Sequence, residues 1–164
     1  MSGPSITLRW NEPGDVADAA AFAAEVIGAE TDYISHGEIQ TGLSDDGSSW
    51  VAGLKELYAT DFTDRGERDL LVAREGDSVV GMLMVAYERS ERRAFAVIED
   101  MAVSPQKRSG GLGKRMLHEA QSRISERRLA WVFLESGLRN EKAHAFFERE
   151  GFRMVSHVYA RKLD

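Results

Sequence analysis

The most informative residues of this chain are 98–113, which read Ile98-Glu99-Asp100-Met101-Ala102-Val103-Ser104-Pro105-Gln106-Lys107-Arg108-Ser109-Gly110-Gly111-Leu112-Gly113. They close a predicted strand, Ala94 to Val103, and continue into a basic loop that is rich in glycine. A helix to about Arg127 should follow, because apolar residues recur every fourth position from Leu112 onward. Three glycines in four positions let the backbone approach a ligand closely, and the free N–H groups that begin a helix attract anions. The stretch therefore predicts a phosphate-binding loop between a strand and a helix.

The charge of this loop favours a ligand with several phosphate charges. Residues 104–115 hold four basic residues and no acidic one, whereas the whole chain has a formal net charge of −6. The nucleotide-binding pattern G-x-x-x-x-G-K-[ST] does not match, because Arg108 stands at its first glycine and Arg115 at its Ser or Thr position. The dinucleotide-binding pattern G-x-G-x-x-G does not match either, because the glycines of this loop are spaced differently. A site for ATP or NAD is therefore a weaker alternative. What does match is R-x-x-G-x-G, Arg108 to Gly113, after a strand that ends in V-x-P.

Composition limits the class of protein around this loop. The length of 164 residues and a hydrophobic content of 43% fit one domain, 1–164, with a real core. The chain has no cysteine, which excludes disulfides and a thiolate nucleophile, and its histidines lack metal-ligand spacing. The negative charge argues against nucleic acid as a partner. No apolar run is long enough for a membrane span and Met1 to Trp10 does not resemble an export signal, so we expect a cytoplasmic protein.

Outward from the loop, hydrophobic periodicity and turn residues predict an order of strands and helices. The expected strands are 6–10, 69–74, 79–87, 94–103, 130–135 and 152–163, and the expected helices are 15–27, 50–59, 112–127 and 140–150. Residues 28–49 are the least regular. Hairpins mixed with crossovers predict an α/β (α+β) fold, a mixed and mostly antiparallel central sheet with helices on both faces.

These motifs together resemble the GNAT superfamily of acyl-CoA-dependent N-acetyltransferases. Residues 98–113 are similar to the central strand and CoA loop of that family. Its second motif is similar to Asn140-x-x-Ala143-x-x-x-Phe147-x-x-x-Gly151-Phe152, and Val79-Val80-Gly81 resembles its usual third-strand opening. The resemblance covers nearly the whole chain in the right order. It implies transfer of an acetyl group from acetyl-CoA, without a metal, to an amine.

The resemblance also implies which residues hold the co-substrate. The CoA pyrophosphate would lie on the loop, chiefly on backbone N–H groups of Arg108, Ser109, Gly110, Gly111, Leu112, Gly113 and Lys114. The backbone of Met101, Ala102 and Val103 would pair with pantetheine as an added strand does. Asn140 would either hydrogen-bond the cofactor or cap its helix. Phe147 departs from the tyrosine that protonates the leaving thiolate in many members, and can only pack against the pantetheine arm.

A carboxylate on the central strand is the candidate general base. On strict alternation, Glu99 shares a face with Phe95, Val97, Met101 and Val103, and apolar surroundings raise the pKa of a carboxyl group as a base requires. Members with an acidic residue at this position are interpreted in the same way. A bulge in the strand would change this alternation of faces. The alternative interpretation of Glu99 is a solvated carboxylate without a catalytic role. Asp100 is the second candidate and Glu135 the third.

The acceptor is less defined by the sequence. Residues 28–49 contain five acidic residues and neither Lys nor Arg, which favours a small cationic amine, although they equally fit a solvated loop. A protein N-terminus or a lysine stays open as acceptor. A non-catalytic acyl-CoA-binding module is a further alternative, because Phe147 lacks a hydroxyl group. Many relatives dimerise, so the resemblance also allows a homodimer.

Overall fold

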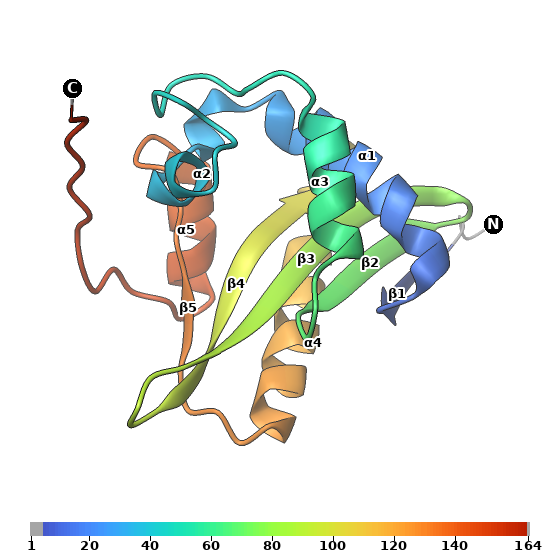
Figure 1. Ribbon diagram of the computed structural model, residues 1–164. Coiled ribbons are helices and arrows are strands. Elements are labelled where there is room, and N and C mark those ends of the chain that lie inside the picture. The colour runs from blue at the N-terminus through green and yellow to red at the C-terminus, as the bar shows by residue number, and fades with distance from the viewer. Residues whose placement is uncertain (1–4, 164) are drawn as a thin grey trace. The chain divides into compact units, whose positions relative to one another are not determined.

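The computed structural model describes residues 5–163, and its central element is a five-stranded sheet (Figure 1). The strands lie in the order β1 (Ile6–Trp10), β2 (Asp69–Glu75), β3 (Ser78–Arg89), β4 (Ala94–Val103) and β5 (Val132–Leu134). The first four are joined by antiparallel ladders, and β5 pairs with β4 in parallel. The mixed, mostly antiparallel sheet predicted from the sequence is therefore confirmed.

The connections explain this arrangement. β2 and β3 form a hairpin whose turn contains Gly76 with a φ of +61°, a conformation that glycine adopts without strain. A parallel pair needs a crossover instead of a hairpin, and α4 (Leu112–Glu126) supplies it between β4 and β5. The 3-10 turn η3 (Pro105–Lys107) separates β4 from α4.

Helices cover both faces of the sheet. α1 (Val16–Gly28) and α3 (Leu54–Thr63) lie in front of it in Figure 1, and α4 lies behind it. Consecutive residues of β2, from Leu70 to Ala73, are at most 1% exposed. Because neighbouring side chains of a strand point to opposite faces, both faces are buried here. At Gly81 of β3 a Cβ atom would lie 2.6 Å from Sδ of Met116, so α4 packs directly on the backbone.

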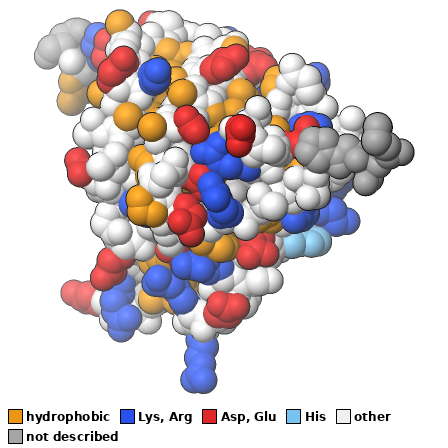
Figure 2. All heavy atoms as spheres, turned by 90° about the vertical axis from the view of Figure 1, so that its right-hand side faces the viewer, with side chains coloured by type: hydrophobic (Ala, Val, Ile, Leu, Met, Phe, Trp, Pro, Cys, Tyr) orange, Lys and Arg blue, Asp and Glu red, His pale blue; other side chains and the backbone are white. Residues whose placement is uncertain are grey.

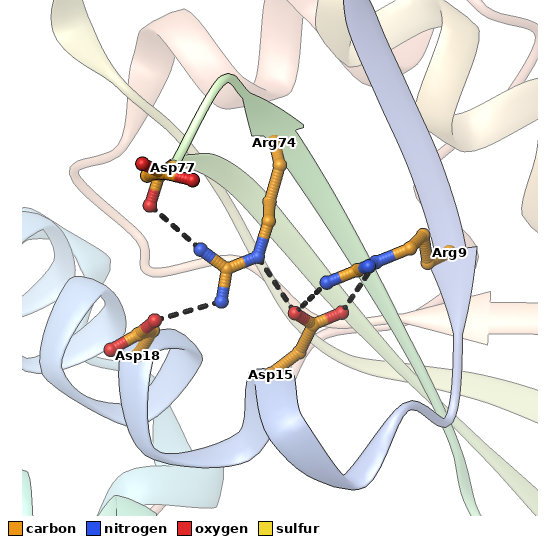
Figure 3. Close-up of polar contacts among 5 residues, drawn as sticks. All are labelled: Arg9, Asp15, Asp18, Arg74 and Asp77. Atoms are coloured by element: carbon orange, nitrogen blue, oxygen red, sulfur yellow. Dashed lines mark hydrogen bonds and ion pairs between the residues drawn. The ribbon is translucent and has the colours of Figure 1, made fainter.

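A buried cluster of ion pairs ties the start of α1 to the sheet (Figure 3). Asp15 is 1% exposed and accepts hydrogen bonds from Arg9 of β1 and Arg74 of β2. Arg74 also donates to Asp18 and to the carbonyl oxygen of Asp77, both at 2.8 Å. Burial acts to raise the pKa of Asp15, but the hydrogen bonds from Arg9 and Arg74 outweigh it and hold the pKa below its usual value.

The described residues form two compact units. One contains the sheet, α1, α3 and α4, and comprises residues 5–29 and 53–134. The other comprises residues 30–52 and 135–163, with a 3-10 turn η2 (Thr31–Tyr33) and the helices α2 (His36–Gln40) and α5 (Glu141–Arg149). Assignment of the whole chain to one domain stays a prediction. On the face drawn in Figure 2, Lys and Arg side chains lie beside Asp and Glu side chains, so the charge there is of mixed sign.

Two elements differ from the sequence prediction. The helix expected from Trp50 begins at Leu54, because Gly53 before it has a left-handed φ of +75°. Residues 152–163 form no strand, although they are rich in strand-forming residues. Several large side chains there are exposed, among them Met154 and Tyr159. The prediction was wrong because residue propensity makes a segment suitable for a strand, whereas a strand exists only when a neighbour pairs with it.

Candidate active site

The glycine-rich loop has the geometry of an anion site. Gly111 is the N-cap of α4 and has a φ of +80°, a left-handed conformation that favours glycine. Glycine has no side chain with which to cap the helix, so the first N–H groups of α4 are offered to the loop. Residues 108–111 are exposed, and Leu112 anchors the helix start in the core. The loop can therefore receive a phosphate on backbone N–H groups at the positive end of the helix dipole.

The basic side chains of this segment are partly used by the fold. Lys107 pairs with Glu75 of β2 at 2.8 Å, and Arg115 donates to the carbonyl oxygen of Ile6 at 3.0 Å. Arg108 donates from Nε to the carbonyl oxygen of Val103 at 3.2 Å, which ties the loop to the end of β4. Lys114 is exposed in the first turn of α4. The segment thus keeps its positive charge while some of its cations also hold the loop in place.

The central strand contains a bulge at Glu99. The ladder with β3 pairs Ile98 with Val85 and Asp100 with Met84, so Glu99 has no opposite residue. Phe95 and Val97 lie on the same face of the sheet as Glu99, as predicted. Beyond the bulge, however, the alternation of side chains between the two faces is reversed. Met101 and Val103 pair with Leu83 and Gly81, whose face is covered by α4. The expected grouping of Glu99 with Met101 and Val103 is therefore wrong, and the extra residue of the bulge is the reason.

The surroundings of Glu99 also differ from the apolar ones expected. Its side chain is 35% exposed, and Oε1 accepts a hydrogen bond from Arg68 at 3.1 Å. Arg68 in turn binds Asp61 of α3 at 2.9 Å. Sequence reasoning missed Arg68, because it lies 31 positions from Glu99 and stands in no motif. The candidate base is held by an ion pair, and its role as base stays a prediction.

The edge of β4 next to Glu99 has the form expected for an added strand. The parallel ladder with β5 joins only residues 96–98 to 132–134, so β5 ends opposite Ile98. Met101, Ala102 and Val103 continue β4 beyond that point and pair with β3 on their other side. Asp100, the second candidate base, lies immediately after the bulge and is partly buried. Strand end, bulge and loop follow one another within residues 99–113.

The second motif lies in the other unit, within residues 135–163. Asn140 occupies the N-cap position of α5, but its side chain makes no capping hydrogen bond. The capping role considered for its side chain is therefore not realised. Phe147 packs its ring against Phe146 and Phe152, with ring centroids 5.3 and 5.8 Å apart.

The same unit contains a cluster of titratable groups. Glu135, the third candidate base, lies with Oε2 2.7 Å from Nε2 of His36. Glu38 is 8% exposed and belongs to the capping box of α2 with Ser35. Burial raises the pKa of Glu38; the charge of Glu135 acts in the same direction, and the hydrogen bond from the Ser35 N–H opposes both. No sequence motif contains His36, so its contact with Glu135 could not be predicted from the sequence.

Comparison with known proteins identifies the family of this chain. The model of the acetyltransferase (GNAT) family matches residues 39–152, well over half of the chain. The chain therefore belongs to the GNAT acetyltransferase family. No curated protein matches the sequence.

Solved structures with the same fold cover nearly the whole chain. An aminoglycoside 6'-N-acetyltransferase from Acinetobacter baumannii has a TM-score of 0.65 at 14% identity, over 98% of this chain and 99% of that one. A ribosomal-protein-alanine N-acetyltransferase from Brucella melitensis biovar Abortus 2308 has a TM-score of 0.70 at 12% identity, over 97% and 100%. A transcriptional regulator from Bacillus halodurans C-125 has a TM-score of 0.70 at 21% identity, again over 97% and 100%. Identities this low establish the fold alone.

Residues 5–163 contain neither a membrane-spanning helix nor a metal-binding cluster. No helix in this range combines the length and the apolar character needed to cross a membrane. The same residues contain no group of three His, Cys, Asp or Glu side chains placed to hold a metal ion.

Proposed function

We propose that this protein is an N-acetyltransferase that moves the acetyl group of acetyl-CoA to a primary amine in a ternary complex. The observation that carries the proposal is the left-handed Gly111 at the start of α4, in a basic loop directly after β4. Backbone N–H groups of residues 108–114 would hold the pyrophosphate of CoA. The edge of β4 at residues 101–103 would pair with pantetheine, which would bring the thioester beside the bulge. Asn140 and Phe147 are proposed as further cofactor contacts.

The proposed chemistry needs one proton acceptor on β4. Glu99 takes a proton from the ammonium group of the acceptor, directly or through water, and the neutral amine attacks the thioester carbonyl carbon. The C–S bond then breaks, CoA leaves as a thiolate that receives the proton lost by the new amide nitrogen, and Glu99 releases its own proton to solvent. Backbone N–H near Met101 would polarise the carbonyl group. Asp100 is the second candidate for the same step.

For the acceptor, we propose a small cationic amine. Residues 30–52 have a net negative charge, although Asp46 accepts hydrogen bonds from the N–H groups of Ser48 and Ser49 and Glu38 is used in a helix cap. Asp45 stays exposed in this segment. The aminoglycoside enzyme among the similar structures supports this class, whereas the ribosomal-protein enzyme supports a protein N-terminus. A non-catalytic acyl-CoA-binding module is a further candidate, and Phe147 is the observation that favours it.

Thiol release from acetyl-CoA tests the proposal. The purified chain is mixed with acetyl-CoA and a panel of polyamines, aminoglycosides, amino acids and short peptides, and acetyl-CoA binding is measured in parallel by calorimetry. We expect release with the polyamines or aminoglycosides. Release with peptides alone would replace the small amine by a protein acceptor. Binding without any release would favour the acyl-CoA-binding module, and no binding would remove the proposed site.

A further inference from the structure

The guanidinium group of Arg68 is held rigidly beside the bulge of β4. Its Nε donates to the carbonyl oxygen of Arg65 at 2.9 Å. One terminal nitrogen donates to the carbonyl oxygen of Asp61 at 3.0 Å and to its Oδ1 at 2.9 Å. The other lies 3.1 Å from Oε1 of Glu99 and 3.4 Å from Oδ2 of Asp61. A guanidinium group is planar, and its N–H donors point in fixed directions. The contacts with Asp61 and with the Arg65 carbonyl oxygen therefore also fix the direction of the N–H group that faces Glu99.

We propose that Arg68 is a positioning residue that orients the carboxylate of Glu99 for proton transfer. Arg68 holds Oε1, and none of residues 5–163 donates a hydrogen bond to Oε2. The bound oxygen fixes the plane of the carboxylate, and the other oxygen is left to accept the proton of the amine. Glu99 is the unpaired residue of a bulge. Its side chain is therefore less constrained by the backbone than the side chain of a residue paired in a regular ladder, and a contact such as that with Arg68 is needed to orient it. The inference rests on the role of Glu99 proposed above.

Asp61 explains why a cation beside the base does not repel an ammonium ion. Asp61, Arg68 and Glu99 together carry one net negative charge, because one carboxylate offsets the guanidinium and the second remains. A pair of Arg68 and Glu99 alone would be neutral. Asp61 therefore both anchors Arg68 and keeps the site attractive to a cationic amine.

A double-mutant cycle on turnover tests the inference. The variants are Arg68→Met, Glu99→Gln and the two combined, and kcat is measured with the best amine of the panel. Arg68→Met should lower kcat about 10- to 100-fold, the size of effect that misplacing a catalytic group has. In the Glu99→Gln background the same change should have almost no further effect, because the group that Arg68 orients is already inactive. The dissociation constant of acetyl-CoA should not change.

Arg65→Met is the matched control. Arg65 lies three residues before Arg68, and its side chain donates to the carbonyl oxygen of Phe62 at 2.9 Å. It should leave kcat unchanged, with thermal melting recorded for every variant. If Arg68→Met does not fold, Arg68→Lys, which keeps the charge but loses the fork, takes its place in the cycle.

The outcomes separate the two levels of the proposal. If Glu99→Gln leaves kcat intact, the general-base assignment fails and the inference fails with it. If Glu99→Gln is impaired but Arg68→Met keeps full kcat, the inference alone is overturned. If Arg68→Met lowers kcat by the same factor in the unchanged protein and in the Glu99→Gln variant, Arg68 acts on stability or on another group. That result also overturns the inference.

Discussion

In the proposed reaction, single side chains determine where a proton is accepted and where one is donated. Glu99 combines an exposed bulge position, one oxygen held by Arg68 and a second oxygen that none of residues 5–163 binds. Phe147 has no proton to donate, and its ring is in contact with two other phenylalanines. At this scale the proposed enzyme has a base but no assigned acid. A thiolate is a tolerable leaving group, so the proton of the new amide nitrogen, passed directly or through water, can replace a side-chain acid.

Glu99→Gln should lower kcat by about 100-fold or more, the usual contribution of a positioned general base. The amide keeps the size of the side chain but cannot accept the ammonium proton. Calorimetry should give the same affinity for acetyl-CoA as the unchanged protein. If the rates at low and at high pH both stay intact, the assignment passes to Asp100, whose Asp100→Asn variant is the direct comparison.

Phe147→Tyr should raise kcat, by a factor on the order of 10, if the ring lies beside the sulfur of CoA. The new hydroxyl group would protonate the thiolate as it leaves. Phe146→Tyr, on the neighbouring position of the same helix, is the control and should not change kcat. A slower Phe147→Tyr enzyme would mean that the leaving group is placed elsewhere.

Helix α4 and the loop before it form the element that defines the proposed cofactor site. Gly111 must adopt a left-handed conformation to start the helix, and Leu112 immediately enters the core. The loop is thereby fixed between the end of β4 and a buried helix, while residues 108–111 stay exposed.

Gly111→Glu should abolish acetyl-CoA binding, with at least about a 100-fold loss of affinity. A side chain at a left-handed φ costs roughly 1–2 kcal/mol, and the new carboxylate would repel the phosphates at a helix N-terminus. Gly66→Glu is the control, because Gly66 also has a left-handed φ, +62°, and lies outside the loop. Unchanged affinity of Gly111→Glu in calorimetry would remove the loop from the proposed site.

At the scale of the whole molecule, stability depends on buried carboxylates as well as on the apolar core. Asp15 joins α1 to the sheet on one face. Asp69 accepts hydrogen bonds from Arg123 of α4, from the Tyr87 hydroxyl group and from Asn11. Burial raises the pKa of Tyr87 to about 12, and the contact with Asp69 adds to the effect.

Asp15→Asn should lower the free energy of unfolding by about 2–4 kcal/mol, because it leaves Arg9 and Arg74, whose side chain is only 12% exposed, without their shared charged acceptor. Asp18→Asn is the matched control. It also removes a partner of Arg74, but the Asp18 side chain is 62% exposed, so the cost should stay below about 1 kcal/mol. Urea unfolding measures both. Equal costs would show that burial of Asp15 does not decide its contribution.

Acid should weaken the fold through the same two carboxylates. Burial acts to raise the pKa of Asp69, but hydrogen bonds from Arg123, Tyr87 and Asn11 outweigh it, so Asp69, like Asp15, has a lowered pKa. A group with a lowered pKa in the folded state stabilises the protein above its unfolded pKa, about 3.9, and this contribution is lost as pH falls further. Urea unfolding should therefore show a decrease below about pH 4 that is shallower in Asp15→Asn.

Much of the fold, and the form of the loop proposed for the cofactor, could be predicted from residue patterns. The strand Ala94–Val103 has the predicted bounds, and the helix after Gly111 begins at Leu112 as its apolar spacing indicated. The site around Glu99 could not be predicted in the same way. A bulge depends on how a strand meets its neighbour, and contact with Arg68 depends on how α3 packs, so neither is visible in local periodicity.

The sequence by itself determined the family, most of the order of elements and the position of the glycine-rich loop that we propose for a phosphate ligand, because glycine spacing, charge and hydrophobic period act over a few residues. Tertiary structure alone decided the face of Glu99, its partner Arg68, the ion cluster of Asp15 and the absence of a strand at residues 152–163. These features join residues far apart in the chain. Their free energy arises only when separate elements pack and pair, and no local pattern records that step.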